Sequence, residues 1–138
     1  MWGRILAMLG LLAVAAPLAA DERALSPLTG QPGDPARGLA LIRDASRASC
    51  LICHSIATLP DRDQGQLGPA LDRVGAAYDA GRIRQRIVDA RTVSPGTIMP
   101  PYFSTEGLYR VGAKWAGTTI YSAQDVEDVV AFLMTLRD

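Results

Sequence analysis

Apolar residues recur at helical spacing near the end of the chain. The stripe follows an i, i+3, i+4, i+7 pattern and consists of Val126, Val129, Val130 and Leu133. Such spacing places all four side chains on one face of an α-helix. The preceding stretch, Ser122 to Asp125, resembles a capping box in which Asp replaces the usual Glu. The sequence therefore predicts a helix that begins after Ser122 and buries its valine face.

A second helix is predicted after a proline-rich stretch. Asp34-Pro35 combines an acidic N-cap with a proline at the first helical position, where the missing N–H costs nothing. Leu39 and Ile42 follow at helical spacing and give this helix an apolar face. We expect the helix to run toward Cys50.

Two shorter patterns predict helices in the middle of the chain. Residues 69–78 suit a short helix, and we expect Gly81 to separate it from a second one. The apolar face of that second helix is marked by Ile83, Ile87 and Val88. Its arginines are expected to form a solvated face, with outward-turned side chains at Arg82, Arg84 and Arg86.

The stretches 59–68 and 93–121 are expected to be loops, because proline and glycine interrupt them and no period is sustained. Ordered loops as long as the second one are usually functional or wrapped around something. The sequence contains no alternation of apolar and polar residues of the kind that would predict a strand. We therefore predict an all-α fold in which helices are joined by long loops.

The first 20 residues have the layout of a secretory signal peptide. Arg4 precedes an apolar run over residues 5–16, and small residues follow it. The run of 12 residues is shorter than the roughly 20 that a membrane-spanning helix needs. We expect cleavage after Ala20, then an extended arm over residues 21–33 and a folded domain over residues 34–138, with no membrane attachment after cleavage.

The charge balance argues against two classes of partner. The chain has 14 basic and 14 acidic residues, and loss of Arg4 with the signal peptide leaves 13 basic residues. A protein so close to neutral has no electrostatic attraction to nucleic acid or to an anionic membrane. Lys114 is the only lysine, so a docking face ringed by lysines is also excluded.

The segment Cys50-Leu51-Ile52-Cys53-His54 is a C-x-x-C-H sequence, the attachment signature of haem c. Two thiols separated by two residues on a helical turn can reach the two vinyl groups on one edge of a porphyrin. The adjacent His54 then places an imidazole nitrogen over the iron. The motif predicts one covalent haem c, and its attachment outside the bacterial cytoplasm agrees with a signal peptide.

Three other uses of the motif fit less well. A structural zinc site needs four protein ligands, and the Cys and His residues of the chain supply only three. A dithiol redox pair would be expected in a thioredoxin-like alternation of strands and helices, and the sequence predicts no strands. A disulfide between Cys50 and Cys53 would leave His54 without a role.

The second axial ligand of the iron must come from another residue type, because His54 is the only histidine. The candidates are Met99, Met134, Lys114 and water. Met134 falls beside the apolar stripe of the last helix and suits a packed core position. Met99 is favoured, because it precedes two prolines in the long loop, and these stiffen the backbone that presents its thioether.

The chain resembles class I cytochromes c over almost all of its mature part. The shared order is an N-terminal helix, C-x-x-C-H, Gly-Pro, a Met-Pro loop and a C-terminal helix. Within that group the chain is most similar to the SoxX family, the monohaem subunits of SoxAX cytochromes in bacterial thiosulfate oxidation. The segments that carry this resemblance are 34–38, 50–54, 67–71, 87–91, 98–102, 107–111 and 122–136.

The resemblance implies a set of site residues and a function. Cys50 and Cys53 would bind the haem, His54 and Met99 would be the metal ligands, and the carbonyl of Pro69 would accept the other ring N–H of His54. The chain would relay electrons in the periplasm, as a subunit beside a SoxA-like cytochrome that joins thiosulfate to a carrier-protein cysteine. A small soluble cytochrome would accept the electrons. No catalytic residue is expected in this chain itself.

Two other functions compete with this one. A free-standing cytochrome c could carry electrons to an oxidase or reductase in the same compartment. A haem enzyme such as a peroxidase would need an open position on the iron, which Met99 would close. The extended arm and the long segment from Tyr102 to Tyr121 favour the subunit, because a lone shuttle needs neither.

Overall fold

The computed structural model describes residues 26–138. The predicted signal peptide and the first part of the predicted arm therefore lie outside the described residues. This part of the chain contains helices and loops without a strand, so the all-α prediction is confirmed. Its helices are α2 (Pro35–Arg43), α3 (Val74–Ala77), α4 (Ala80–Asp89) and α5 (Ala123–Leu133). Within the same range, every helix is too short or too polar to cross a membrane.

Helix α5 forms the centre of the fold, and its predicted start and apolar face are both confirmed. The Ser122 side chain accepts from the backbone N–H of Asp125, and the Asp125 side chain accepts from Ser122 in return. The predicted stripe is buried, with Val126 fully inaccessible to solvent. Ile42 of α2, Ile83 and Ile87 of α4 and the aromatic residue Tyr121 complete the same core.

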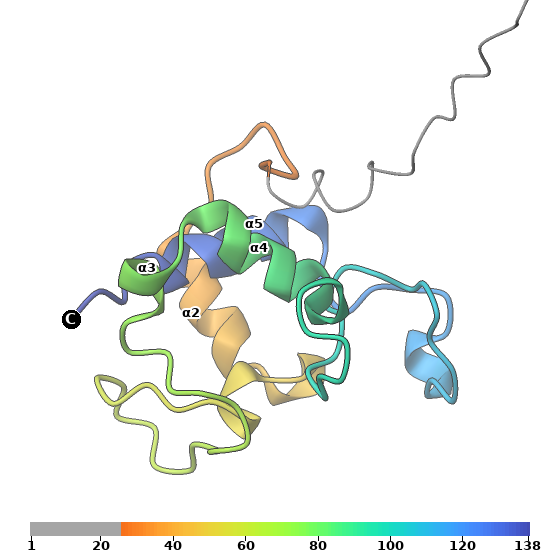
Figure 1. Ribbon diagram of the computed structural model, residues 1–138, viewed down its shortest axis with the longest axis horizontal. Helices are drawn as coiled ribbons and strands as arrows, with labels where there is room; N and C mark the ends of the chain where they lie inside the picture. Colours follow the sequence, from red (N-terminus) through yellow and green to blue (C-terminus); the bar gives the residue numbers. More distant parts are fainter. Residues whose placement is uncertain (1–25) are drawn as a thin grey trace, which may run out of the picture.

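Helix α2 crosses α5 at close range, as Figure 1 shows. A Cβ on Gly38 would lie 2.0 Å from the carbonyl oxygen of Asp128, so only glycine allows the two helices to approach this far. The predicted N-cap is confirmed, because the Asp34 side chain accepts hydrogen bonds from the N–H groups of Ala36 and Arg37. Arg37 also pairs with Asp128, at 2.7 Å between Nε and Oδ2.

Helix α4 departs from the prediction in two ways. Asp79 is its N-cap, and Gly81 lies inside the first turn and does not separate two helices. Arg84 does not face solvent: it is 4% exposed and pairs with Glu127 of α5, at 2.7 Å between Nε and Oε1. The prediction for Arg84 was wrong because its partner lies far away in the sequence. Arg82 is exposed, as expected.

Helix α3 is shorter than the predicted 69–78. The chain before it is not helical: the Leu71 N–H bonds to the carbonyl of Ser55 at 2.9 Å, and residues 72–73 form a turn. Inside α3, a Cβ on Gly75 would lie 2.7 Å from the carbonyl oxygens of Leu133 and Met134, so the helix rests against the end of α5. Contacts to distant segments therefore set the bounds of α3.

The long loop over 93–121 is confirmed, interrupted only by the short 3-10 turn Ala113–Trp115. The two ends of its second part, residues 102–121, meet where the N–H of Tyr121 donates to the carbonyl of Tyr102 at 2.8 Å. The rings of the two tyrosines also pack together, with centroids 4.7 Å apart. Between these ends the chain projects away from the helices, on the right in Figure 1.

Candidate functional site

The C-x-x-C-H motif begins on a 3-10 turn, Cys50–Ile52, which follows α2 and a first short 3-10 turn, Ala45–Arg47. Ser49 caps the turn: its hydroxyl accepts from the N–H of Leu51 at 3.2 Å and donates to the carbonyl of Ile42 at 2.6 Å. The backbone N–H of His54 closes the turn by donating to the carbonyl of Cys50 at 2.9 Å. The helical turn that the motif requires is therefore present and tied to α2.

His54 lies against the Gly68-Pro69 segment. Its Nδ1 is 2.7 Å from the carbonyl oxygen of Pro69. The N–H of Gly68 donates to the carbonyl of Cys53 at 2.8 Å, which holds this segment beside the motif. A Cβ on Gly68 would lie 2.3 Å from Cε1 of the imidazole, so a side chain at this position would displace the ring. An imidazole that donates from Nδ1 to a carbonyl presents Nε2 to a metal.

Cys50 and Cys53 are free thiols in different environments. Cys50 is deeply placed, and burial raises the pKa of its thiol to about 11. The hydroxyls of Tyr102 and Tyr121 both interact with this thiol. Burial also raises the pKa of each tyrosine, so both hydroxyls keep their protons. The groups that meet Cys50 on this side of the motif are thus uncharged.

From the sequence, Tyr102 and Tyr121 were expected only as the first and last residues of a loop segment. The Tyr102 hydroxyl donates to the carbonyl of Ala48 at 2.7 Å, just before the motif. The Arg47 guanidinium lies 5.1 Å from the ring centroid of Tyr121 and bonds to Asp125. The presence of a tyrosine at each end of the segment 102–121 was the only signal for these contacts in the sequence.

Met99 is carried by a loop that is fixed at both ends. Before it, the N–H of Thr97 donates to the carbonyl of Ser94 at 3.0 Å and makes a turn. After the two prolines, the N–H of Tyr102 donates to the carbonyl of Ile87 in α4 at 3.1 Å. Met99 is half-buried against the core, whereas its neighbour Ile98 is 77% exposed. The loop therefore directs the thioether inward.

The other two candidate ligands have different surroundings. Met134 is the C-cap residue of α5 and packs where that helix meets α3. The ammonium of Lys114 donates to the carbonyl of Ser46 at 3.1 Å and lies 4.6 Å from the ring centroid of Trp115. These two contacts direct the Lys114 side chain toward Ser46 and Trp115. Met134 is half-buried against the core as Met99 is, but it lies at the end of a helix, whereas Met99 lies on the proline-stiffened loop.

The donors assembled around the motif fit haem c. The fit rests on two free thiols on one turn, an imidazole oriented through Nδ1 by Pro69, and a glycine flush against that ring. The chemistry of this donor set, together with an inward thioether on a stiff loop, matches what covalent attachment and axial ligation of a haem require. The arrangement lacks the fourth Cys or His donor of a structural zinc site, since the chain contains no further Cys or His.

Comparisons with known proteins agree with this chemistry. The family model "Cytochrome c" matches residues 36–137. A chain in the crystal structure of SoxXA from P. pantotrophus superposes with a TM-score of 0.75 and 34% sequence identity. The match covers 82% of this chain and 88% of that chain. No curated protein sequence matches significantly.

The family match extends over most of the chain, and it includes the helices, the C-x-x-C-H motif and the Met-Pro loop. The solved relative has the same fold at an identity that indicates common descent. The SoxX-like character expected from the sequence is confirmed by that relative. The chain belongs to the cytochrome c family: it is an all-α, class I c-type cytochrome that resembles SoxX, carries covalently bound haem c and transfers electrons.

Proposed function

We propose that this chain is the SoxX subunit of a periplasmic SoxAX complex, and that it takes the electrons released when thiosulfate is conjugated to a cysteine of a carrier protein. The observation that carries the proposal is the 34% identity to a chain of SoxXA over 82% of this chain. The partner would be a SoxA-like cytochrome subunit, and a small soluble cytochrome would accept the electrons.

Five residues would hold and tune the cofactor. Cys50 and Cys53 would form the thioether bonds, His54 and Met99 would ligate the iron, and the carbonyl of Pro69 would fix the proton of His54 at Nδ1. Haem c supplies a one-electron iron couple when it is bound. The Met99 thioether would favour ferrous iron and so raise the reduction potential relative to a second histidine.

The conjugation itself requires a partner. A carrier thiol and thiosulfate form a sulfur–sulfur bond with loss of one proton and two electrons, and this chain would receive those electrons one at a time. Once both thiols are used for attachment, the chain retains no cysteine to act as a nucleophile. The sulfur chemistry therefore belongs on the SoxA-like subunit, and this chain alone would not be catalytic.

The experiment is reduction of the haem by thiosulfate, followed by its visible spectrum, with the carrier protein present. We expect reduction only when the SoxA-like subunit is added. Reduction without that subunit would place the sulfur chemistry on this chain. A chain that stays monomeric in native extract, yet exchanges electrons with an oxidase, would favour the free-standing shuttle.

The ligand assignment has its own test. Met99→Ala should remove the weak long-wavelength sulfur-to-iron band of the ferric protein, lower the reduction potential and open the iron to imidazole. The matched control is Met134→Leu, which should change none of these because Met134 packs at the end of α5. Loss of the band in Met134→Leu would show that the wrong methionine had been assigned.

A further inference from the structure

The segment over residues 105–118 exposes apolar side chains that the rest of the molecule does not cover. Tyr109 is 84% exposed, and Leu108 and Val111 are each 37% exposed. Figure 1 shows this segment standing away from the helices. Large apolar side chains gathered on one projecting element mark a site of interaction with another molecule.

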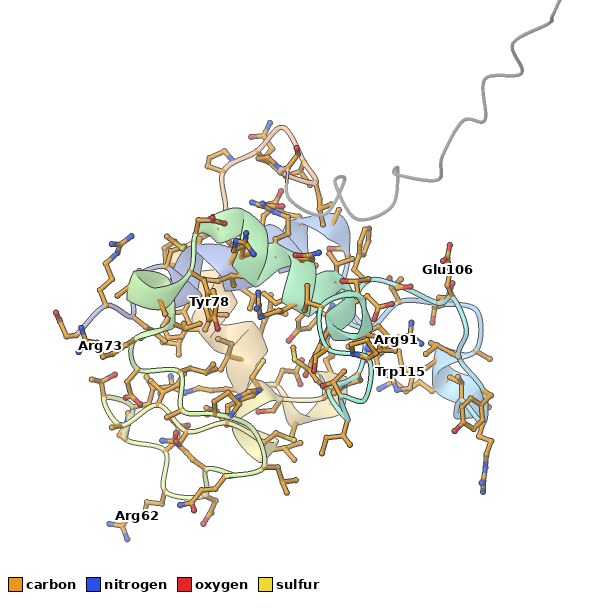
Figure 2. All side chains as sticks on the ribbon, in the orientation of Figure 1. Arg62, Arg73, Tyr78, Arg91, Glu106 and Trp115 are labelled. Atoms are coloured by element: carbon orange, nitrogen blue, oxygen red, sulfur yellow. The ribbon has the colours of Figure 1, made fainter. Side chains whose placement is uncertain are left out.

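The segment is held in shape before any partner binds. Arg91 donates to the carbonyl of Glu106 at 2.8 Å and is itself fixed by Asp89, at 2.8 Å between Nε and Oδ1. Figure 2 places Arg91 on the side of the body from which the segment projects, with Glu106 pointing into solvent. Lys114 makes a second attachment through the carbonyl of Ser46. A loop fixed in this way loses little conformational entropy on binding.

Arg91 joins the stretch 87–91 to Glu106, which directly precedes the stretch 107–111. The stretch 87–91 supplies Asp89 and Arg91, and the stretch 107–111 supplies the exposed Leu108 and Tyr109. Both stretches stood out in the sequence, and neither contributes a donor to the candidate haem site. The bond from Arg91 therefore positions a segment whose exposed apolar residues do not hold the cofactor.

The charge of the segment indicates the kind of surface it meets. Arg110 and Lys114 are basic and exposed, against a single acid, Glu106. Arg110 has a φ of 56°, a left-handed conformation that an arginine adopts only when its surroundings hold it there. Exposed Arg110, the residue that follows exposed Tyr109, suits an apolar cleft bordered by carboxylates.

We propose that residues 105–118 form a preformed docking segment, which inserts Leu108 and Tyr109 into an apolar cleft, bordered by carboxylates, on the SoxA-like partner subunit. This inference rests on the proposed function and adds the surface and the chemistry of the contact. The solved relative comes from a structure of SoxXA, which agrees with a partner of this kind.

The test measures binding of the haem-loaded protein to the separately purified SoxA-like subunit from the same source. We expect Tyr109→Ser to weaken binding at least about tenfold, because buried aromatic anchors dominate interfaces. Arg110→Glu should slow association several-fold, and more at low salt than at high salt. Arg91→Ala should weaken binding several-fold through loss of the held shape. All three should keep the sulfur-to-iron band.

Two control variants match the chemistry at other exposed positions. Tyr78→Ser removes a tyrosine that is 40% exposed, and Arg82→Glu reverses an exposed arginine on α4. Both should bind as wild type does. If Tyr109→Ser also binds as wild type and Ile98→Ser loses binding, the docking surface lies beside the Met99 loop, and the proposal fails while the complex stands. If the wild-type protein does not bind the subunit at all, the proposed complex itself is wrong.

Discussion

The helical framework and the loops that carry the proposed haem ligands are stabilised in different ways. In the framework of α2, α4 and α5, apolar faces meet each other, and the buried charges of Arg84 and Glu127 are paired. In the loops over 54–73 and 93–121, single hydrogen bonds to distant segments fix the backbone at separated points. The framework is complete within the protein, whereas the loops surround the place where a cofactor must lie.

Exposed apolar residues make the same distinction. Ile52, Leu67 and Ile98 flank the proposed haem donors and are 58%, 73% and 77% exposed. The buried residues of α5 and α2, such as Val126 and Ile42, are fully covered by protein. The comparison teaches that the polypeptide alone accounts for the helices, while the loops depend on an apolar cofactor for part of their burial.

Removal of the attachment thiols should break this balance most strongly. Cys50→Ser with Cys53→Ser should give haem-free and largely unfolded protein, because the core loses its largest apolar component. Wild-type protein should retain its colour after denaturation in acid and organic solvent, whereas the variant should have none to retain. Hydrogen exchange measures the structure that remains in the variant. The amides of the loops should lose protection more completely than those of α5. Haem that can be extracted from the wild type would contradict covalent attachment.

Breaking the buried ion pair should damage the framework and leave the haem donors in place. Arg84→Ala leaves the buried carboxylate of Glu127 without its charged partner and with the Leu28 N–H still donating to it, which costs about 3–5 kcal/mol of unfolding free energy. Denaturant titration measures this loss, and the reduction potential should change little. The double variant Arg84→Met with Glu127→Leu should be less destabilised than Arg84→Ala, because neither charge remains. Equal losses in the two variants would show that packing rather than charge sets the cost.

A methyl group at Gly68 should act on the site alone. The Cβ of Gly68→Ala would meet the His54 ring at 2.3 Å, so the imidazole or its segment must shift, at about 1–3 kcal/mol. We expect an altered ferric spectrum and a lower yield of haem-loaded protein. Gly96→Ala is the matched control, because a Cβ there meets nothing within 4 Å. An unchanged spectrum in Gly68→Ala would show that His54 does not need this close contact.

Lowering the pH should destabilise the helical framework, and this loss of unfolding free energy is the smallest of the four expected effects. Hydrogen bonds from Arg37 lower the pKa of Asp128 to about 2, below the ordinary value of about 4. The stabilisation is therefore complete above about pH 4 and is lost as the pH falls toward 2, about 1–2 kcal/mol in all. Asp128→Asn should flatten this part of the stability profile. Asp61→Asn should have a smaller effect, because the Asp61 carboxylate, which pairs with Arg43, is more exposed than that of Asp128.

The parts of the fold that local chemistry decides were predictable. The stripe and the capping box of α5, and the acidic N-cap with proline of α2, act within a few residues of each other, and the structure has both helices where they were expected. The long loop over 93–121 was equally predictable, because proline and glycine act locally. The motif at residues 50–54 indicated the cofactor for the same reason, since its spacing alone meets the requirement of haem c.

Long-range partners decided what the sequence could not predict. Arg84 reads as a surface residue within α4 and is buried only because Glu127 of α5 faces it. The first half of the predicted helix over 69–78 is not helical, because the Leu71 N–H bonds to the carbonyl of Ser55. Tyr102 and Tyr121 meet beside Cys50 through a loop closure that no local pattern announces. In each case the deciding contact joins segments that are distant along the chain.

The close crossing of α2 and α5 also has a consequence for the order of folding. Arg37 and Gly38 meet Asp128, so the first described helix packs against the last one. A chain emerging from its N-terminus cannot make this contact until α5 has been released, and contacts of such long range form slowly. Cys50 and Cys53 emerge well before α5. During this interval both thiols stay accessible in an unfolded chain, which gives haem attachment time to precede the burial of Cys50.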